Sequence, residues 1–160
     1  MDQQPTSLEE TRSRLEAAAD ALEGLDAVLH QASGPELTRL MTLCDRVASR
    51  AGSARVSITA EAVTRGEVAA SGTNAHAWVR DHAPSLRQGG AAAVASVAQS
   101  VAPAASQWRP EGGEVDPESA LGIVWAGVAS GAVSPALATA VMRELDRLEP
   151  LLVAEAVPTV

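Results

Sequence analysis

His76 and His82 are the residues of this chain whose type is most often used for chemistry, because imidazole serves as a metal ligand and as an acid or base near neutral pH. They stand six positions apart in a short helical pattern, AHAWVRDH. On a helix this spacing places two side chains on different faces, so the pair cannot share a metal ion without ligands from elsewhere. We expect ordinary surface residues, with His76 beside Arg80. His82 pairs in the same way with Asp81.

The other candidates for a reaction centre are also better explained as structure. Cys44, the single cysteine, falls on the apolar side of a helical pattern, where a buried and unreactive thiol is typical. Glu111, Glu114 and Asp116 could gather around a cation, but their segment reads as a solvated loop. We find no glycine-rich phosphate loop, cysteine pair or nucleophile elbow in the sequence. It therefore predicts no catalytic, cofactor or metal site, and a protein that is not an enzyme.

The composition predicts an all-α fold. Hydrophobic residues make up 46% of the 160, yet there is no Phe, no Tyr and only three Trp. Much of that fraction is alanine, which suits helices, whereas strands favour β-branched and aromatic side chains. The length suits one domain over residues 1–160. A lone cysteine forms no internal disulfide, and the acidic start lacks the pattern of a signal peptide, so we expect a cytoplasmic protein.

The net charge of −8 is unevenly spread along the chain. Residues 1–67 hold eleven acidic residues and seven Arg. Residues 68–110 hold one acidic residue and three Arg, and residues 111–160 hold eight acidic residues and two Arg. Proteins that bind nucleic acid through its phosphates usually present a basic patch. Only the middle segment has a small positive excess, so the charge disfavours strong autonomous DNA binding.

Residues 7–66 predict a long antiparallel helical hairpin. Thr6 to Glu9 reads as a capping box, and a helix of about 25 residues follows with one apolar seam. That seam is made by leucines seven residues apart, Leu8, Leu15, Leu22 and Leu29. Ser33-Gly34-Pro35 then begins a second helix, about 45 Å long, that ends at Gly66. The short turn favours an antiparallel pair, and the seams suit a homodimer or a partner protein.

Charged residues flank both seams. Acidic residues lie on the first helix and arginines on the second: Glu9, Glu16, Asp20 and Glu23, then Arg39, Arg46 and Arg50. We interpret them as the complementary flanks of a coiled coil, which set its orientation more than its stability. The alternative is a stripe of arginines that contacts phosphates.

Residues 73–102 predict a short pair of helices that resembles a helix-turn-helix. Thr73 or Asn74 caps the first helix, which ends before Pro84, and Ser85 caps the second. In such motifs the second helix reads the major groove of DNA. Its polar face here would be Arg87, Gln88, Ser96 and Gln99.

Two observations weaken this DNA-binding interpretation. Gly89-Gly90 and three alanines follow directly, which favours a small-residue helix packed closely on a neighbour. Among the polar residues of that face, only Arg87 is charged. We therefore keep nucleic-acid contact as the alternative, with Arg80, Arg87, Gln88 and Arg109 as the contacting residues.

The rest of the chain predicts a loop over residues 103–115 and helices over residues 116–155. Pro117 suits the first turn of a helix that ends at Gly131, and Ser134-Pro135 begins the last helix. Pro150 stops it. The stretch from 120 to 142 is uncharged and long enough to cross a membrane. It consists of small residues broken by Ser134-Pro135, so we expect two buried short helices and no membrane association.

These signals together resemble the actinobacterial 13E12 repeat family, also called domain of unknown function 222. The resemblance covers residues 8–155 and depends on ordered helical motifs, GTNAHAWVRDHAPSLRQGG and GAVSPALATAV. Its firmest matches are Gly72, Trp78, Arg80, Gly131, Val133, Ser134 and Ala138. Many members carry an HNH endonuclease module further along the chain, and no such module follows here.

The resemblance implies a fold and a class of function. The fold is a helical hairpin followed by a bundle of about four shorter helices. The region that the chain resembles is similar to a regulatory or targeting part placed ahead of a nuclease, so no catalytic residue carries over. We expect a non-enzymatic helical module that acts by interaction or assembly. The alternatives are a weak DNA-binding accessory module and an inactive fragment of a longer nuclease.

Overall fold

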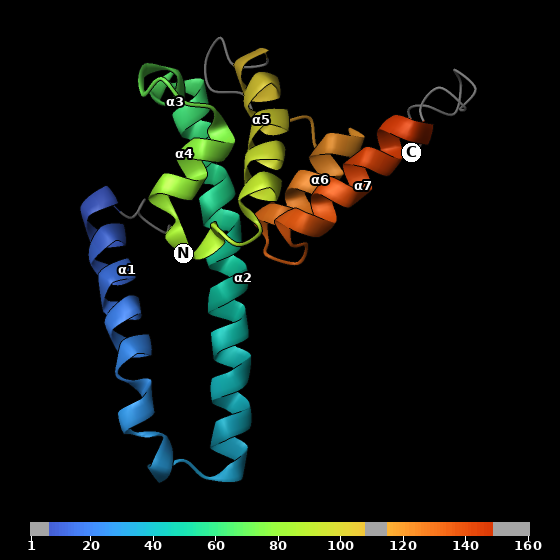
Figure 1. Cartoon of the computed structure of the whole chain (residues 1–160). Helices are drawn as coiled ribbons and strands as arrows, with labels where there is room; N and C mark the ends of the chain where they lie inside the picture. The colour runs from blue at the N-terminus through green and yellow to red at the C-terminus, as the bar shows by residue number, and fades with distance from the viewer. Residues whose placement is uncertain (1–6, 108–114, 149–160) are drawn as a thin grey trace. The chain divides into compact units, whose positions relative to one another are not determined.

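The computed structural model describes residues 7–107 and 115–148 (Figure 1). Every regular element within these ranges is a helix, which confirms the all-α prediction. Contacts between residues divide the chain into two compact units, Met1–Cys44 and Asp45–Val160. Several predicted features lie outside the described residues, namely Thr6, Arg109, Glu111, Glu114 and Pro150.

The first unit opens with α1, Leu8–Glu23, whose start and end differ from the prediction. Its cap is Ser7, whose hydroxyl accepts a hydrogen bond from the Glu10 N–H at 3.1 Å. The helix ends at Gly24, well short of the predicted length. Two 3₁₀ turns follow, η1 Leu25–Ala27 and η2 Leu29–Gln31. The leucine spacing continues into these tighter turns, which explains why the predicted helix was too long.

The helix α2, Gly34–Thr64, confirms the second predicted helix. At its start the Glu36 carboxylate accepts hydrogen bonds from the Ser33 N–H and the Ser33 hydroxyl, at 2.7 and 2.5 Å. These bonds lower the pKa of Glu36 below its ordinary value of 4.5, the hydroxyl bond being the larger cause. After the helix, Gly66 has a φ of +77°, a left-handed conformation that favours glycine.

α5, Ala91–Gln107, contributes more buried residues to the second unit than any other helix. Figure 1 shows α5 beside α4, Ala75–His82, with α7, Pro135–Leu148, on its other side, and α5 packs against both. The core is built from alanine and valine. Its largest fully buried side chains are Val56, Val97 and Val128.

The segment around α4 corrects two predictions. A short helix, α3 Glu67–Ala70, occupies most of residues 67–72, which lie between the predicted hairpin and the predicted helix pair and for which no helix was expected. Asn74 caps α4 as predicted, by accepting from the Ala77 N–H at 2.9 Å. The next helix does not begin at Ser85, because a 3₁₀ turn, η3 Pro84–Leu86, comes first. Gly90 then takes a φ of +90°, and α5 begins only after it.

The end of α5 corrects the predicted loop 103–115. The helix continues through Pro103 to Gln107. Proline normally disrupts a helix interior because it lacks an N–H. The alanines on both sides of Pro103 have high helix propensity, which favours the helical conformation and so opposes the effect of the proline.

The helices α6, Ala120–Ala129, and α7 form the end of the described chain. The cap of α6 is Ser119, which accepts from the Gly122 N–H at 2.9 Å, so the helix starts later than the predicted Pro117. Asp116 holds the preceding turn by accepting the Glu118 N–H at 3.0 Å. Gly131, with a φ of +78°, follows the helix as predicted. Ser134 caps α7 by accepting the Leu137 N–H at 3.2 Å.

The middle of α2 contacts the end of α6 through polar groups within the second unit. The Ser53 hydroxyl donates to the carbonyl oxygen of Val128. The Arg50 guanidinium donates to the carbonyl oxygen of Ala129 at 3.4 Å. The last carbonyls of a helix lack partners inside the helix and carry a partial negative charge. α2 therefore supplies both a donor and a positive charge to the end of α6.

Gly122 gives a test of how tightly the second unit packs. A Cβ added there would lie 1.8 Å from the carbonyl oxygen of Asp116. We expect Gly122→Ala to lower the free energy of unfolding by about 1–3 kcal/mol or more, because the backbone must shift. Urea denaturation followed by far-UV circular dichroism measures the change. Gly89→Ala is the control, because no heavy atom lies within 4 Å of its added Cβ. Equal stability of the two variants would contradict the close contact.

The cap of α2 predicts a pH effect with a defined sign. Ionised Glu36 accepts both bonds from Ser33, so this stabilisation is present above its ordinary pKa and is lost as the pH falls through its lowered pKa. A carboxyl titration by NMR should therefore place the pKa of Glu36 below 4.5. Ser33→Ala should raise it, because the hydroxyl donor is removed. The control, Ser7→Ala at the other helix start, should leave the pKa of Glu36 unchanged.

Candidate functional site

The candidate residues for chemistry do not come together in the structure. His76 is exposed, and His82 is exposed with its ring stacked on Trp78 at a centroid distance of 4.4 Å. The His82 Nδ1–H donates to the Trp78 carbonyl oxygen at 2.8 Å. Cys44 is half-buried. Within the described ranges, no three His, Cys, Asp or Glu side chains lie close enough together to hold a metal ion.

The candidate nucleic-acid residues are only partly brought together. Arg80 is exposed on α4, and the Arg87 Nε–H donates to the Arg80 carbonyl oxygen at 3.1 Å, so these two residues are neighbours. Arg87 and Gln88 lie in the turn before α5 and not on a helix. The prediction that they form the polar face of a recognition helix is therefore wrong. Gly89 and Gly90 delay the start of that helix.

The charged flanks of the two long helices pair differently from the prediction. The salt bridges among the described residues join side chains three or four positions apart, such as Arg12 with Glu9 and Arg65 with Glu61, both at 2.6 Å. Pairs at this spacing stabilise their own helix by about 0.2–0.5 kcal/mol. Arg39 and Arg46 are exposed, and Arg50 binds the end of α6.

The residues that carry the family resemblance lie at structural positions. Gly72 has a φ of +70°, and Gly131 lies at the turn after α6. Trp78 is half-buried against the core, Ser134 caps α7, and Ala138 is fully buried. These residues therefore have structural roles at turns, helix caps and core positions.

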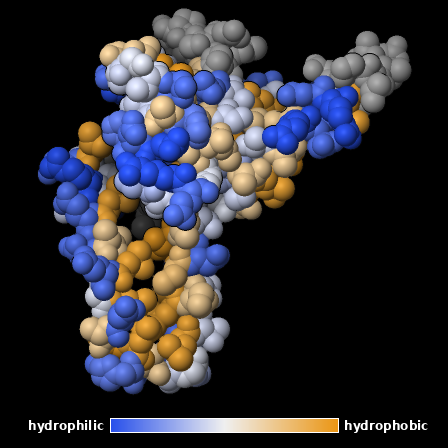
Figure 2. Space-filling model, viewed as in Figure 1, coloured by the Kyte–Doolittle hydropathy of each residue, from blue (hydrophilic) through white to orange (hydrophobic). Residues whose placement is uncertain are grey.

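The strongest candidate for function is an apolar surface on the first unit, which we call the leucine seam. It consists of side chains on α1 and on the start of α2, namely Leu8, Leu15, Leu22, Leu37, Met41 and Leu43. Leu8 is 87% exposed, Leu15 62% and Met41 72%. Figure 2 shows apolar side chains gathered at the surface around the turn that joins the two helices. Between residues 7 and 44 no residue is buried.

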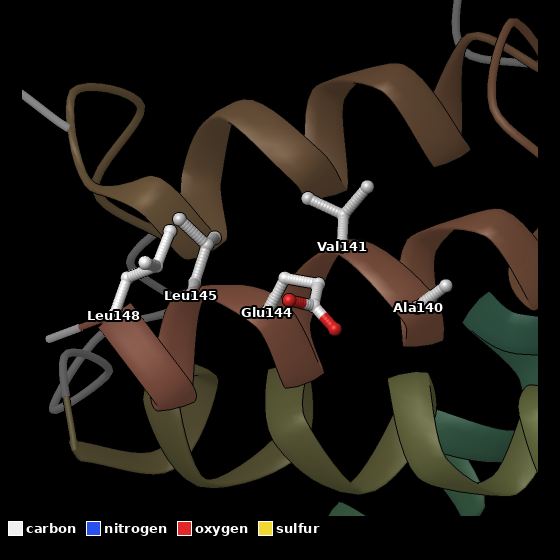
Figure 3. A pocket seen from close by; sticks show the side chains of 5 residues that line it. All are labelled: Ala140, Val141, Glu144, Leu145 and Leu148. Atoms are coloured by element: carbon white, nitrogen blue, oxygen red, sulfur yellow. The ribbon is translucent and has the colours of Figure 1, made fainter.

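A second apolar face lies on α7 in the other unit. Figure 3 shows Leu145 and Leu148 side by side near the C-terminal end of the helix, with Val141 nearer its start. These side chains, with Ala140 and Glu144, line a shallow hollow of about 270 Å³. Val141 and Leu148 are exposed.

These faces matter because exposed apolar surface is costly in water. Removing it from water yields about 25 cal/mol per Å², and large contiguous apolar patches on a protein mark interaction sites. In the described ranges no leucine is buried, whereas the core is made of alanine and valine. The leucines and Met41 of the seam thus remain available for contact with another molecule.

Comparisons with known proteins add no relative to this picture. No family model matches the chain, and neither the curated proteins nor the solved structures gave a match. The resemblance to the 13E12 repeat family thus stays a prediction from its helical motifs. None of the described helices is long and apolar enough to cross a membrane.

Proposed function

We propose that this protein is a non-enzymatic helical module of the 13E12 type that acts by interaction and assembly. The single observation that supports it most is the leucine seam, together with the lack of any buried residue between positions 7 and 44. A segment of this size without a core gains little stability alone. Contact with a second helical surface would supply the missing burial.

The proposal includes the arrangement of α1 and α2 as an antiparallel hairpin ahead of the shorter helices. The spacing of Leu8, Leu15 and Leu22 is that of one side of a coiled coil, in which each leucine enters a hole formed by four residues of the facing helix. Helices from a second copy or from a partner protein would supply those holes and complete a bundle. The seam therefore fits a helical partner better than a small molecule.

Charge would select the orientation of that partner. The residues beside the seam on α1 include Glu16, Asp20 and Glu23, whereas Arg39 and Arg46 lie on α2. A partner helix with basic flanks suits α1, and a partner helix with acidic flanks suits α2. The hairpin itself carries both, so a second copy in the reverse orientation offers both complements.

The alternative of autonomous DNA binding has less support. The net charge is −8, and Arg87 and Gln88 precede the helix that was expected to enter the groove. Arg80 and Arg87 are neighbours, but two arginines give only a small electrostatic contribution to phosphate binding.

Self-association measured by sedimentation velocity over a range of concentrations tests the proposal. We expect the protein to form dimers or larger assemblies, and Leu15→Ser with Met41→Ser to weaken them at least about tenfold. Each fully buried side chain of this size contributes about 1.5–3 kcal/mol. Ala17→Ser, on the opposite side of α1, is the matched control and should assemble normally.

The contrary outcome is equally clear. A protein that stays monomeric at every concentration, and that retains no partner protein through the seam in a pull-down compared with the Leu15→Ser, Met41→Ser variant, would contradict the proposal.

A further inference from the structure

A separate hollow lies within the second unit, between α2 and the end of α4. Its volume is about 370 Å³, near the lower end of the range for small-molecule sites. The residues that matter here are Arg55 and Ile58 from α2, Trp78, Val79 and His82 from α4, and Ser85 from the turn that follows. None of them belongs to the leucine seam, so this site and the proposed function are independent.

One wall of the hollow is apolar and rigid. Val79 is buried, and Trp78 is half-buried and packs against the core. The Trp78 indole and the His82 imidazole are stacked at 4.4 Å, with 28° between their planes. The bond from His82 Nδ1 to the Trp78 carbonyl holds the imidazole in this position. Flat or branched apolar groups pack well on such an aromatic surface.

The opposite wall combines apolar surface with a positive charge. Ile58 lines the hollow and is 57% exposed, which is unusual for an isoleucine beside an aromatic wall. Arg55 is half-buried and donates to the Ser85 hydroxyl at 3.4 Å. It forms no salt bridge with any described residue, whereas the nearest carboxylate along the helix, Glu61, is bonded to Arg65. Its guanidinium has five N–H donors, so most remain available for a ligand.

We propose that this hollow binds a small organic carboxylate with an aromatic or branched apolar body. The carboxylate would accept a bidentate pair of hydrogen bonds from Arg55, a geometry that the planar guanidinium favours. The body would lie between Ile58 and the stacked pair of Trp78 and His82. A single arginine balances one negative charge, so a monoanion fits this lining better than a phosphate dianion.

Titration of the ¹⁵N-labelled full chain with 3-phenylpropionate tests this site by NMR. We expect saturable shifts confined to residues 55–59 and 78–85. Two further probes separate the parts of the ligand: 3-phenylpropionamide keeps the body without the charge, and acetate keeps the charge without the body. Both should bind at least several-fold more weakly.

Variants then assign the contacts. Arg55→Gln keeps a donor for Ser85 but removes the charge, and should weaken 3-phenylpropionate about tenfold or more, as expected for hydrogen bonds to a charged group. Ile58→Ser changes an exposed side chain and should weaken binding by a smaller factor. Arg65→Gln, outside the hollow, is the matched control and should bind normally.

The same titration also tests whether the ligand is a free carboxylate or the C-terminus of a peptide. A tripeptide that ends in a free phenylalanine shares the chemistry of the probe, and its amidated form does not. Binding of the free tripeptide at the same residues identifies a chain terminus as a ligand, whereas binding of the small probe alone identifies a free carboxylate. Shifts that do not saturate, that spread over the chain, or that saturate with unchanged affinity in Arg55→Gln would overturn the proposal.

Discussion

Close approach of helices through small side chains is the constraint on which the second unit depends. Its largest fully buried side chains are valines, and Ala98 and Ala138 are buried completely. Small side chains fill little space, so their helices must lie near one another before dispersion contacts accumulate. The bond from the Ser53 hydroxyl on α2 to the Val128 carbonyl on α6 requires such a short separation. So does the approach of Gly52 on α2 to Pro135 on α7, where an added Cβ would lie 3.8 Å from the proline Cδ. The buried hydroxyl is satisfied, as the low-dielectric interior demands.

The small side chains of the core are matched by an unusual number of large apolar side chains at the surface. The fully buried positions are filled mainly by alanine and valine; some larger apolar residues, such as Leu121 and Trp125, pack against this core, and many others are exposed. On α1 they repeat at a regular spacing, and on α7 they lie along the helix at Leu137, Val141 and Leu148, the last two being visible in Figure 3. Regular spacing is what a second helix can match, whereas scattered apolar residues on a surface need no explanation. The seam on α1 and α2 supports the proposed function more strongly than the face on α7, because no residue between 7 and 44 is buried, whereas α7 also contributes Ala138 to the core.

Much of the fold could be predicted from local sequence signals, and the errors have physical causes. The starts of α4 and α7 were predicted because Asn74 and Ser134 are typical helix caps. The predicted end of the first helix was wrong because the leucines keep their spacing through the 3₁₀ turns that follow α1. The predicted start of α5 was wrong because Ser85 is a typical helix cap by residue type, yet the helix begins only after Gly90, which has a positive φ. The hollow at Arg55 was also missed, since its walls come from segments far apart in the chain. One signal was available: Arg55 has no acidic residue three or four positions away, unlike Arg65.

The fully buried alanines have a practical consequence for genetics. Substitution by alanine is the usual way to locate important positions, and it gives no information at positions where the native residue is already alanine. In this molecule the sensitive positions would be revealed by enlarging side chains, because an extra methyl at Ala98 or Ala138 has nowhere to go. A survey of substitutions would therefore find that larger side chains are poorly tolerated at these buried alanines.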